Sequence, residues 1–590
     1  MMKITNEPVD VVIVGLGWTG AIQGIELART GLKIRALERG ADRTSAEFAY
    51  PVPADELAYT KRHKIMQSPA VAAFTTRHNL NEVALPMREL GSFRLGDGVG
   101  GAGLHWTAMI TRPTPVDLKL ATYAREKFEK SQLDKELRIY DFPVSWSEIE
   151  PHMDFFDQVC GSSGQAGNVR GQILPGGDPF EGPRSSPFPN PPLIDTLNSS
   201  MFRQAATEMG YHPYSIPSAA VSQAFTNPYG QQIAPCNYCG YCQFYSCLNY
   251  SKASPQTAIL DRLKQYDNFD YKTHANVIRV EKHADGKTAT GVTYIDENDN
   301  EVFQPAKIVI LASFGLNNVR LLLNSKIGQP YNPVTEEGVV GRNYTHQYGG
   351  GITLYFNQLE FNPFATAGPT GVVITDFGTG NINTADLGFI GGAKIYSSQP
   401  TGTPMGAPVI DSAAKWGSRW KKGLKQSYGH SMAIKLEGSN MATQTNYLDL
   451  DPNYKDKFGM PLLRVTYDYV QNDLRMLQFM REKMVGIAEH LKPDHYSVGM
   501  LKMDSHFASS PAYANTHNAG GAIMGDNPKT SVVNRYLQSW DVHNVFVMGA
   551  CVFPQNVYAN PTALVAGLTY WSAKAIRETY LNNPGPLVQA

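Results

Sequence analysis

Four of the six cysteines lie close together, at Cys236, Cys239, Cys242 and Cys247, in the pattern C-x2-C-x2-C-x4-C. Thiolates so near in sequence can converge on one site with little loss of loop entropy. The first three cysteines match the start of a bacterial ferredoxin run, although the last gap is one residue longer and no proline follows. Zinc usually takes two C-x2-C pairs that lie further apart. The pattern therefore favours an iron–sulfur cluster over zinc or free thiols, and leaves open whether it is 3Fe-4S or 4Fe-4S.

A second chemical motif lies near the N-terminus, where a β-branched run, Val11 to Val14, leads into G-x-G-x-x-G. In this motif Gly15 permits a tight turn, Gly17 lets a pyrophosphate approach the helix that follows, and Gly20 allows close packing of helix on strand. A second strand then ends at Glu38, whose carboxylate can bind ribose hydroxyls. Strand, glycines, helix, strand and acid are in register, which predicts a dinucleotide site. The N-terminal position favours FAD, and this stretch alone does not exclude NAD.

The composition of the chain limits what else it can be. Its 590 residues predict two or three lobes, and its net charge of −1 gives no basis for binding nucleic acid or an anionic membrane. No apolar run reaches the about 18 residues that a membrane-spanning helix needs. The N-terminus is short and polar before the first strand, so we expect no cleavable signal in this chain.

The elements that must position these motifs follow from periodicity. Residues 307–312 form a β-branched run typical of a parallel strand, and helices are expected over 194–209, 317–323, 471–491 and 563–580. Ser145 with Glu148 three residues later predicts a capping box at the start of another helix. Residues 346–500 alternate polar and apolar residues and predict an antiparallel sheet. Within it His430, Lys435 and Glu437 are expected to be solvated surface positions, with contact to a polar ligand as the alternative.

The stretch Gly100-Gly101-Ala102-Gly103-Leu104-His105-Trp106-Thr107, with Arg112-Pro113 after it, carries a family resemblance. It resembles the second flavin contact of the glucose–methanol–choline (GMC) oxidoreductases, and especially that of the pyranose oxidases. The resemblance implies an FAD enzyme that oxidises alcohols or sugars. It also implies that His105 either carries the flavin covalently through the 8α position or packs beside the ring.

The C-terminal quarter is similar to the same family. His517 lies in a His-x-x-Gly-Gly stretch, and Asn560 lies directly before Pro-Thr. The resemblance implies that His517 is the catalytic base and that Asn560 orients the substrate hydroxyl and stabilises the alkoxide. His543 is the competing histidine, and a place at a strand edge is expected for it. The cofactor contacts implied by the family positions, besides those named above, are Val277, Ala312, Gly549, Ala550, Asn560, Pro561 and Thr562.

The resemblance implies an α/β fold with two domains. A Rossmann-like FAD-binding domain would be discontinuous, at 8–345 and 505–583, and would carry an iron–sulfur loop at 230–256. A substrate-binding domain, built on an antiparallel β-sheet with helices, would occupy 346–504.

The cysteine run and the following Lys252-Ala253-Ser254-Pro255 resemble the large subunits of gluconate 2-dehydrogenases, which are associated with a three-iron cluster. This implies oxidation of a sugar acid, D-gluconate to 2-keto-D-gluconate, with electrons passed through the cluster to a cytochrome c or quinone. It implies partners, namely a small subunit with a twin-arginine signal and a multihaem cytochrome c. The chain would be periplasmic and membrane-associated only through them, a cytoplasmic enzyme being the alternative.

Three other functions remain open from the residues alone. One is another sugar dehydrogenase of the family, such as a glucoside 3-dehydrogenase. A second is a non-catalytic electron-transfer subunit, against which the His517 and Asn560 pair argues. The third is an oxidase that makes peroxide.

Overall fold

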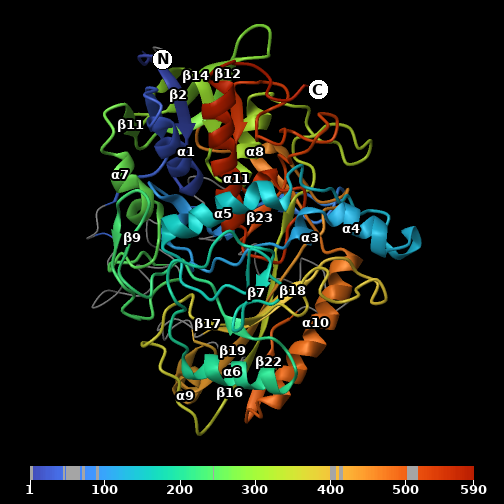
Figure 1. Cartoon of the computed structure of the whole chain (residues 1–590). Helices are drawn as coiled ribbons and strands as arrows, with labels where there is room; N and C mark the ends of the chain where they lie inside the picture. Colours follow the sequence, from blue (N-terminus) through green and yellow to red (C-terminus); the bar gives the residue numbers. More distant parts are fainter. Residues whose placement is uncertain are drawn as a thin grey trace.

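The computed structural model of the chain is organised around two large β-sheets that build separate hydrophobic cores (Figure 1). It describes residues 4–43, 47, 67–68, 74–87, 92–243, 245–398, 407–410, 416–500 and 516–589. The expected domain boundary between 504 and 505 lies outside the described residues. Both ends of the chain lie at the end of the molecule that holds the first sheet.

The first sheet is mainly parallel and contains both ends of the sequence. Its order is β11-β3-β2-β14-β13-β12, and β1 and β24 also pair with β14. Its strands are β1 Ile4–Thr5, β2 Val9–Val14, β3 Ile34–Leu37, β11 Phe269–Lys272, β12 Asn276–Lys282, β13 Ala289–Ile295, β14 Glu301–Leu311 and β24 Val545–Val547. The predicted β-branched runs form β2 and the end of β14, since strands covered on both faces need continuous apolar residues. The pairing of β24 with β14 brings the C-terminal quarter beside the N-terminal motif.

Three helices stack over this sheet: α1 Trp18–Ala28, α5 Trp146–Cys160 and α11 Thr562–Ala575. Every residue of α1 is buried, because the helix lies between the sheet and α11. Helix α5 begins with the predicted capping box, in which the Ser145 backbone N–H and hydroxyl both donate to Glu148 at 2.8 Å. The fold class expected from the sequence is therefore confirmed on this side of the molecule.

The second sheet is antiparallel, with the order β22-β16-β19-β18-β17-β8. Its strands are β8 Tyr214–Ser215, β16 Tyr348–Tyr355, β17 Gly371–Ile374, β18 Ala393–Ser398, β19 Ser431–Gly438 and β22 His495–Val498. Helices α6 Leu197–Glu208 and α10 Gln471–His490 pack on it and complete the second core. One face of the sheet is thereby buried, and part of the other face is left to line a cavity.

The expected single sheet over 346–500 is in fact two sheets. Strand β20 Tyr447–Lys455 pairs with β21 Pro461–Thr466, β21 pairs with β4 Phe74–Arg77, and β4 pairs with β5 Leu85–Pro86. Leu448, Leu463 and Val465 are buried in the core of the first sheet. The alternating pattern identified the strands, but only their long-range pairing decides which sheet each one joins.

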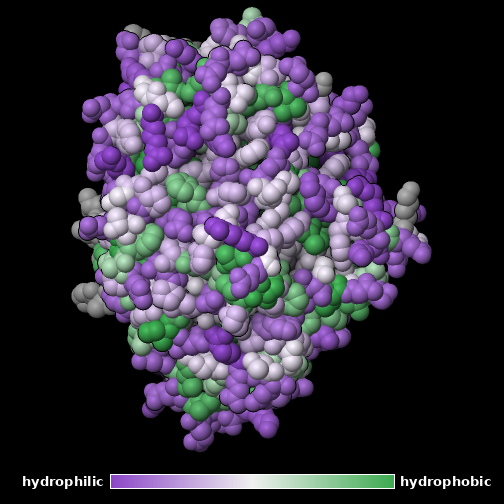
Figure 2. Space-filling view, in the orientation of Figure 1, coloured by the Kyte–Doolittle hydropathy of each residue, from purple (hydrophilic) through white to green (hydrophobic). Residues whose placement is uncertain are grey.

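The remaining elements are short or lie at the edges. The predicted helices are confirmed within a few residues as α6, α8 (Gly315–Asn324), α10 and α11. The other elements are α3 Pro115–Leu118, α4 Leu120–Lys127, α7 Asp261–Leu263, α9 Gly417–Ser427, β6 Asn168–Val169, β7 Gln172–Ile173, β9 Phe225–Thr226, β10 Gln232–Ile233, β15 Thr345–His346 and β23 Asn518–Ala519. Among the described helices none is both long enough and apolar enough to cross a bilayer. The face shown in Figure 2 is mostly hydrophilic, with hydrophobic residues in small scattered groups.

Candidate active site

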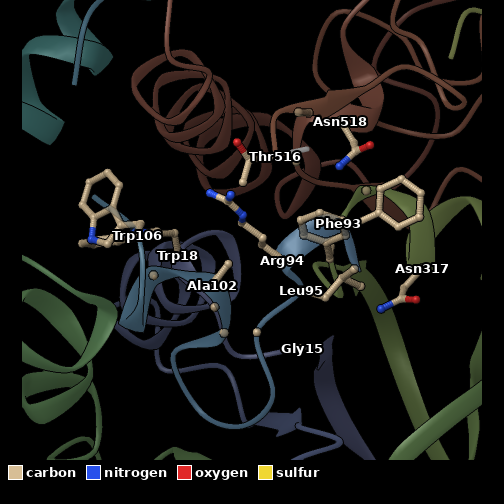
Figure 3. Close-up of a pocket in the computed structure, with 18 of the residues that line it drawn as sticks. Gly15, Trp18, Phe93, Arg94, Leu95, Ala102, Trp106, Asn317, Thr516 and Asn518 are labelled. Atoms are coloured by element: carbon tan, nitrogen blue, oxygen red, sulfur yellow. The ribbon is translucent and has the colours of Figure 1, made fainter. Parts of the chain in front are cut away.

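One large cavity, of about 590 Å³, is lined by residues of both large sheets. Its wall includes the turn between β2 and α1, the loop 93–107, the turn between β14 and α8, strands β18 and β19, and the segments before β23 and α11. Figure 3 shows Gly15, Ala102 and the two tryptophans, Trp18 and Trp106, on one side, and Arg94 extending from its loop toward Thr516. Residues far apart in the sequence thus surround one space.

The glycines of the N-terminal motif have different surroundings. Gly15 has φ +93°, and a Cβ there would lie 2.6 Å from the Ala312 carbonyl oxygen. A Cβ on Gly20 would lie 2.1 Å from the Gly15 oxygen, so Gly20 allows α1 to pack on the turn and does not itself line the cavity. Gly17 faces the cavity, and the nearest atom to a Cβ there is 3.8 Å away. The open approach to the N-terminus of α1 is therefore at Gly17, where an anionic group would be favoured.

Glu38 lies at the end of β3 and lines the same cavity. Its carboxylate accepts hydrogen bonds from the backbone N–H of Leu16 at 3.0 Å and of Gly40 at 2.9 Å. These two bonds hold the carboxylate beside the glycine turn. The position suits recognition of a ribose, as the sequence predicts.

The second glycine loop packs directly against the first. Gly100 has φ +97°, and its N–H donates to the Leu16 carbonyl at 2.8 Å. Gly101 and Gly17 are so close that a Cβ on Gly101 would lie 3.5 Å from the Gly17 Cα. Gly101, His105, Trp106 and Thr107 line the cavity, whereas Gly100 lies behind its wall against Gln256.

His105 is a buried histidine with an orphaned ring nitrogen. Its exposed fraction is 4%, and its Nε2 has no hydrogen-bond partner among the described residues. Burial, reinforced by the charges of Lys252 and Arg94, lowers the pKa of His105 to about 3. A neutral imidazole with a free nitrogen at a cavity wall can bond to or pack beside a ring placed there.

The other predicted cofactor contacts come to the same cavity from three separate parts of the chain. Residues on its wall include Val277, Ala312, Gly549, Ala550, Asn560, Pro561 and Thr562. Pro561 and Thr562 lie at the start of α11, whose N-terminus thus faces the cavity, as that of α1 does. Two helix N-termini and a glycine-lined wall fit a dinucleotide with its phosphates and rings.

His517 lines the cavity, and its hydrogen bond to Gln347 sets its tautomer. The Gln347 side-chain N–H groups point at three backbone carbonyls, those of Val557 at 2.9 Å, Tyr558 at 2.7 Å and Ala559 at 3.1 Å. The amide oxygen of Gln347 must then be the atom that contacts Nδ1 of His517. Since that oxygen only accepts, Nδ1 carries the proton and Nε2 keeps a lone pair for the cavity.

Burial keeps His517 neutral. It is the main cause that lowers the pKa of His517 to about 4; Glu437 opposes this shift, and the positive charges of Lys394 and Arg94 add to it. A neutral imidazole at ordinary pH can accept a proton from a substrate hydroxyl.

Asn560 is held by a buried polar network. Its side-chain oxygen accepts from the Thr111 hydroxyl at 2.9 Å and from the Lys394 ammonium. Its side-chain N–H donates to Glu437 at 3.1 Å, and Lys394 pairs with Glu437 at 2.8 Å. Lysine only donates and a carboxylate only accepts, so the orientation of the amide is determined. Among the described residues no acceptor takes the second N–H of Asn560, which is left available to a ligand.

Strands β18 and β19 supply the rest of this wall, and here one expectation was wrong. Lys435 and Glu437, expected at the solvated surface, line the cavity, while His430 does not. Alternate residues of a strand share a face, which places Lys394, Tyr396 and Ser398 of β18 beside Lys435 and Glu437 of β19. The competing histidine, His543, is also not among the lining residues and packs near Tyr580.

Gln347, Thr111, Lys394 and Arg94 were not singled out from the sequence. None belongs to a motif. Lys394 and Glu437 are charged residues on the side of their strands that faces the cavity. The sequence shows that side chains alternate between two faces, but it does not show which face points inward.

The four cysteines of the run lie near one another, with Cys242 buried and the other three partly exposed. Burial raises the pKa of Cys236 to about 11 and that of Cys242 to about 12, and the thiols also influence each other electrostatically. However, within the part of the chain that the structure describes, no three histidine, cysteine, aspartate or glutamate side chains are grouped so that they could hold a metal ion. As placed, the thiols do not fit a cluster.

Lys252 joins the cysteine run to the wall of the cavity. Its buried ammonium donates to the carbonyls of Cys242 at 2.8 Å and Tyr245 at 2.7 Å on one side. On the other side it donates to the carbonyls of Leu104 at 3.2 Å and Trp106 at 2.8 Å, the residues that flank His105. The two loops are therefore fixed to each other through one cation.

Comparisons with known proteins agree with this architecture. Two family models, each described as GMC oxidoreductase, match residues 194–348 and 442–569. The gluconate 2-dehydrogenase flavoprotein of Pantoea cypripedii is 47% identical over 100% of this chain and 97% of its own length. The 2-methyl-1,2-propanediol dehydrogenase of Mycolicibacterium austroafricanum is 25% identical over 96% of this chain and 95% of its own length. The crystal structure of pyridoxine 4-oxidase from Mesorbium loti has a similar fold, with a TM-score of 0.58 at 15% identity, covering 96% of this chain and 99% of that one.

Proposed function

We propose that this chain, which belongs to the GMC oxidoreductase family, oxidises the C2 hydroxyl of D-gluconate to give 2-keto-D-gluconate. As a member of the family it is an FAD-dependent oxidoreductase that acts on CH–OH groups. The observation that carries the proposal is that His517 and Asn560 line the same cavity as the glycine turn at Gly15 and Gly17. The choice of gluconate follows the relative with 47% identity.

The proposed base is His517. With its proton on Nδ1 bonded to Gln347, its Nε2 is the atom that takes the proton of the substrate hydroxyl. A pKa of about 4 leaves the imidazole unprotonated before the substrate arrives. Because the ring is buried, the positive charge it acquires in the reaction is balanced by Glu437, which acts on it electrostatically.

Asn560 is proposed to bind the same hydroxyl oxygen. Its free N–H can donate to the oxygen as negative charge develops there, which stabilises the alkoxide. Thr111 and Lys394 hold the amide from its oxygen side, so the donor is oriented before the substrate binds. Removal of one such donor typically costs about 10²- to 10³-fold in rate.

We propose that Gly17, Gly101 and Glu38 hold the pyrophosphate and ribose parts of FAD, and that Trp106, Thr107 and the start of α11 hold the ring. When bound, FAD accepts the hydride from the substrate carbon. The orphaned Nε2 of His105 supports a contact with the flavin, either covalent or by packing. Acid precipitation separates these two: yellow colour that stays with the protein indicates the covalent bond.

We further propose that Cys236, Cys239, Cys242 and Cys247 hold an iron–sulfur cluster and that electrons leave for a cytochrome c or quinone. The spacing of the cysteines supports this, although the thiols would have to move closer together than they lie here. Iron and sulfide analysis with electron paramagnetic resonance of anaerobically purified protein tests it. Zinc, or no metal, in such protein would contradict it.

The partners and location are proposals of the same kind. We propose a small subunit with a twin-arginine signal, a multihaem cytochrome c subunit and a periplasmic site at the membrane. Their support is the identity to a protein named as the flavoprotein of gluconate 2-dehydrogenase. Co-purification and cell fractionation in the native host test them, and an enzyme recovered alone from the cytoplasm would contradict them.

The central experiment is anaerobic reduction of the purified holoenzyme, followed through the visible flavin bands. Bleaching by gluconate supports the proposal, whereas bleaching only by a neutral sugar or glucoside indicates the other dehydrogenase function. No bleaching by any sugar or sugar acid indicates a non-catalytic electron-transfer subunit. Rapid reoxidation by air with release of peroxide would instead indicate an oxidase.

A further inference from the structure

Lys435 lies on the cavity face of the second sheet, next to the proposed catalytic residues. It is two residues from Glu437 on β19, a separation of about 7 Å along a strand. In the register of the sheet it pairs with Tyr396 of β18. Its side chain reaches the cavity wall that also includes His517 and Asn560.

Glu437 acts on Lys435 electrostatically but forms no ion pair with it among the described contacts. Glu437 is fully engaged, with one carboxylate oxygen bonded to Lys394 at 2.8 Å and Asn560 at 3.1 Å and the other accepting from Tyr396 at 3.2 Å. The hydrogen bond of Lys435 goes to the neutral hydroxyl of Ser398 at 3.2 Å. Among the described residues no carboxylate lies within ion-pair distance of Lys435. A partly buried cation of this kind is costly unless an anion joins it.

The cavity also leaves room beside this cation. In β16, Gly349 and Gly351 pair with Glu437 and Lys435. Gly349 lines the cavity, and a Cβ there would meet no atom within 4 Å, whereas one on Gly351 would lie 2.9 Å from the Ile434 carbonyl oxygen. The absence of a side chain at Gly349 therefore leaves space over Glu437, two residues along the strand from Lys435.

We propose that Lys435 binds the carboxylate of the substrate, so that this cavity selects 2-hydroxy acids of the sugar-acid class over neutral sugars. The inference rests on the proposed function, because it names the group that recognises the substrate in the same site. A carboxylate at Lys435 would complete the ion pair that Glu437 cannot supply. Arg94, which also lines the cavity and acts electrostatically on Lys435, adds to the attraction. The carbon that bears the reacting hydroxyl is bonded to the carboxylate carbon, so it would lie toward Asn560 and His517.

The test compares gluconate with its uncharged amide, gluconamide, as substrates of the holoenzyme. The wild type should use gluconate about 10- to 100-fold better in kcat/KM, the range expected for a hydrogen bond to a charged group. Lys435→Met should remove most of this advantage through KM while leaving the rate with gluconamide within about 3-fold. Lys435→Arg should restore part of the preference. Lys421→Met, an exposed lysine of α9, is the matched control and should change neither substrate.

Each other outcome overturns the inference in a recognisable way. An equal loss with gluconate and gluconamide would mean that Lys435 is structural, and the proposed oxidation would still stand. A loss of bound FAD in Lys435→Met would assign the lysine to the cofactor. If the wild type oxidised neither compound, the proposed function itself would fail, and this inference with it.

Discussion

Gln347 and His517 face each other at the end of a two-stranded ladder between β15 and β23. Thr345 pairs with Ala519 and His346 with Asn518, so Gln347 and His517 come next in the register. The ladder brings together two residues that are 170 positions apart in the sequence. Three backbone carbonyls then orient the glutamine amide, and the amide in turn orients the imidazole. The backbone of one loop thereby decides which nitrogen of His517 can act as a base.

The first prediction concerns this relationship. Gln347→Met removes the acceptor at Nδ1 and should lower kcat with gluconate about 10- to 100-fold, because the imidazole is no longer held in one tautomer and orientation. Gln347→Glu keeps an acceptor but adds a negative charge, so it should raise the pKa of His517 and move the acid limb of the rate profile to higher pH. Gln444→Met, which removes an amide remote from the cavity, is the control. Wild-type rates and an unmoved profile in Gln347→Glu would refute the role.

The second prediction is the pH dependence of the reaction. Burial and nearby cations lower the pKa of His517 from an ordinary 6.5 to about 4, so kcat/KM should stay level as the pH falls through 6.5 and should drop only near 4. In the unfolded chain the same histidine takes up a proton near pH 6.5, so the folded state loses stability as the pH falls from there toward 4. Rates of anaerobic flavin reduction from pH 4 to 8 measure the first effect. An acid limb near 6.5 would show that His517 is not the base or is not buried in the active form.

The third prediction separates two glycines of one motif. Gly17 has φ −84°, and a Cβ there would come no closer than 3.8 Å to another atom, so Gly17→Ala should leave the stability of the FAD-free protein within about 0.5 kcal/mol. It should nevertheless weaken FAD binding by at least about tenfold, because the methyl group takes the place of a phosphate at the helix N-terminus. Gly20→Ala meets a backbone oxygen at 2.1 Å and should destabilise the fold itself. Chemical unfolding and FAD titration of the FAD-free forms measure both, with Gly585→Ala as the control.

The fourth prediction concerns Lys252. Lys252→Met would leave four carbonyl groups without their donor and should cost about 3–5 kcal/mol of stability, the range for breaking a buried charged cluster. The loop with His105 should loosen at the same time, which near-ultraviolet and flavin circular dichroism would record. Lys264→Met, which removes a partly exposed ion pair with Asp42, should cost no more than about 1 kcal/mol. Similar losses in the two variants would argue against a special role for Lys252.

Much of the fold was predictable because its signals are local. The run Val11 to Val14 and the three glycines after it define a strand, a turn and a helix within a few residues. The capping box at Ser145 is likewise a local pattern, and it forms as predicted. The alternation over 346–500 identified strands correctly but not their partners, since β20 pairs with β21 and β21 with β4, and neither joins the sheet that contains β16.

By itself, the sequence determined the chemistry that is available: a dinucleotide turn at Gly15 to Gly20, a histidine and an asparagine in family positions, and a run of four cysteines. The tertiary structure alone decided which side chains share the cavity and in what state. Gln347 reaches His517 only because β15 pairs with β23, and Lys394 meets Glu437 only because β18 pairs with β19 in one register. The alternation of residues along a strand indicates which side chains share a face. The partner of each side chain across the sheet depends on long-range pairing, which no local pattern encodes.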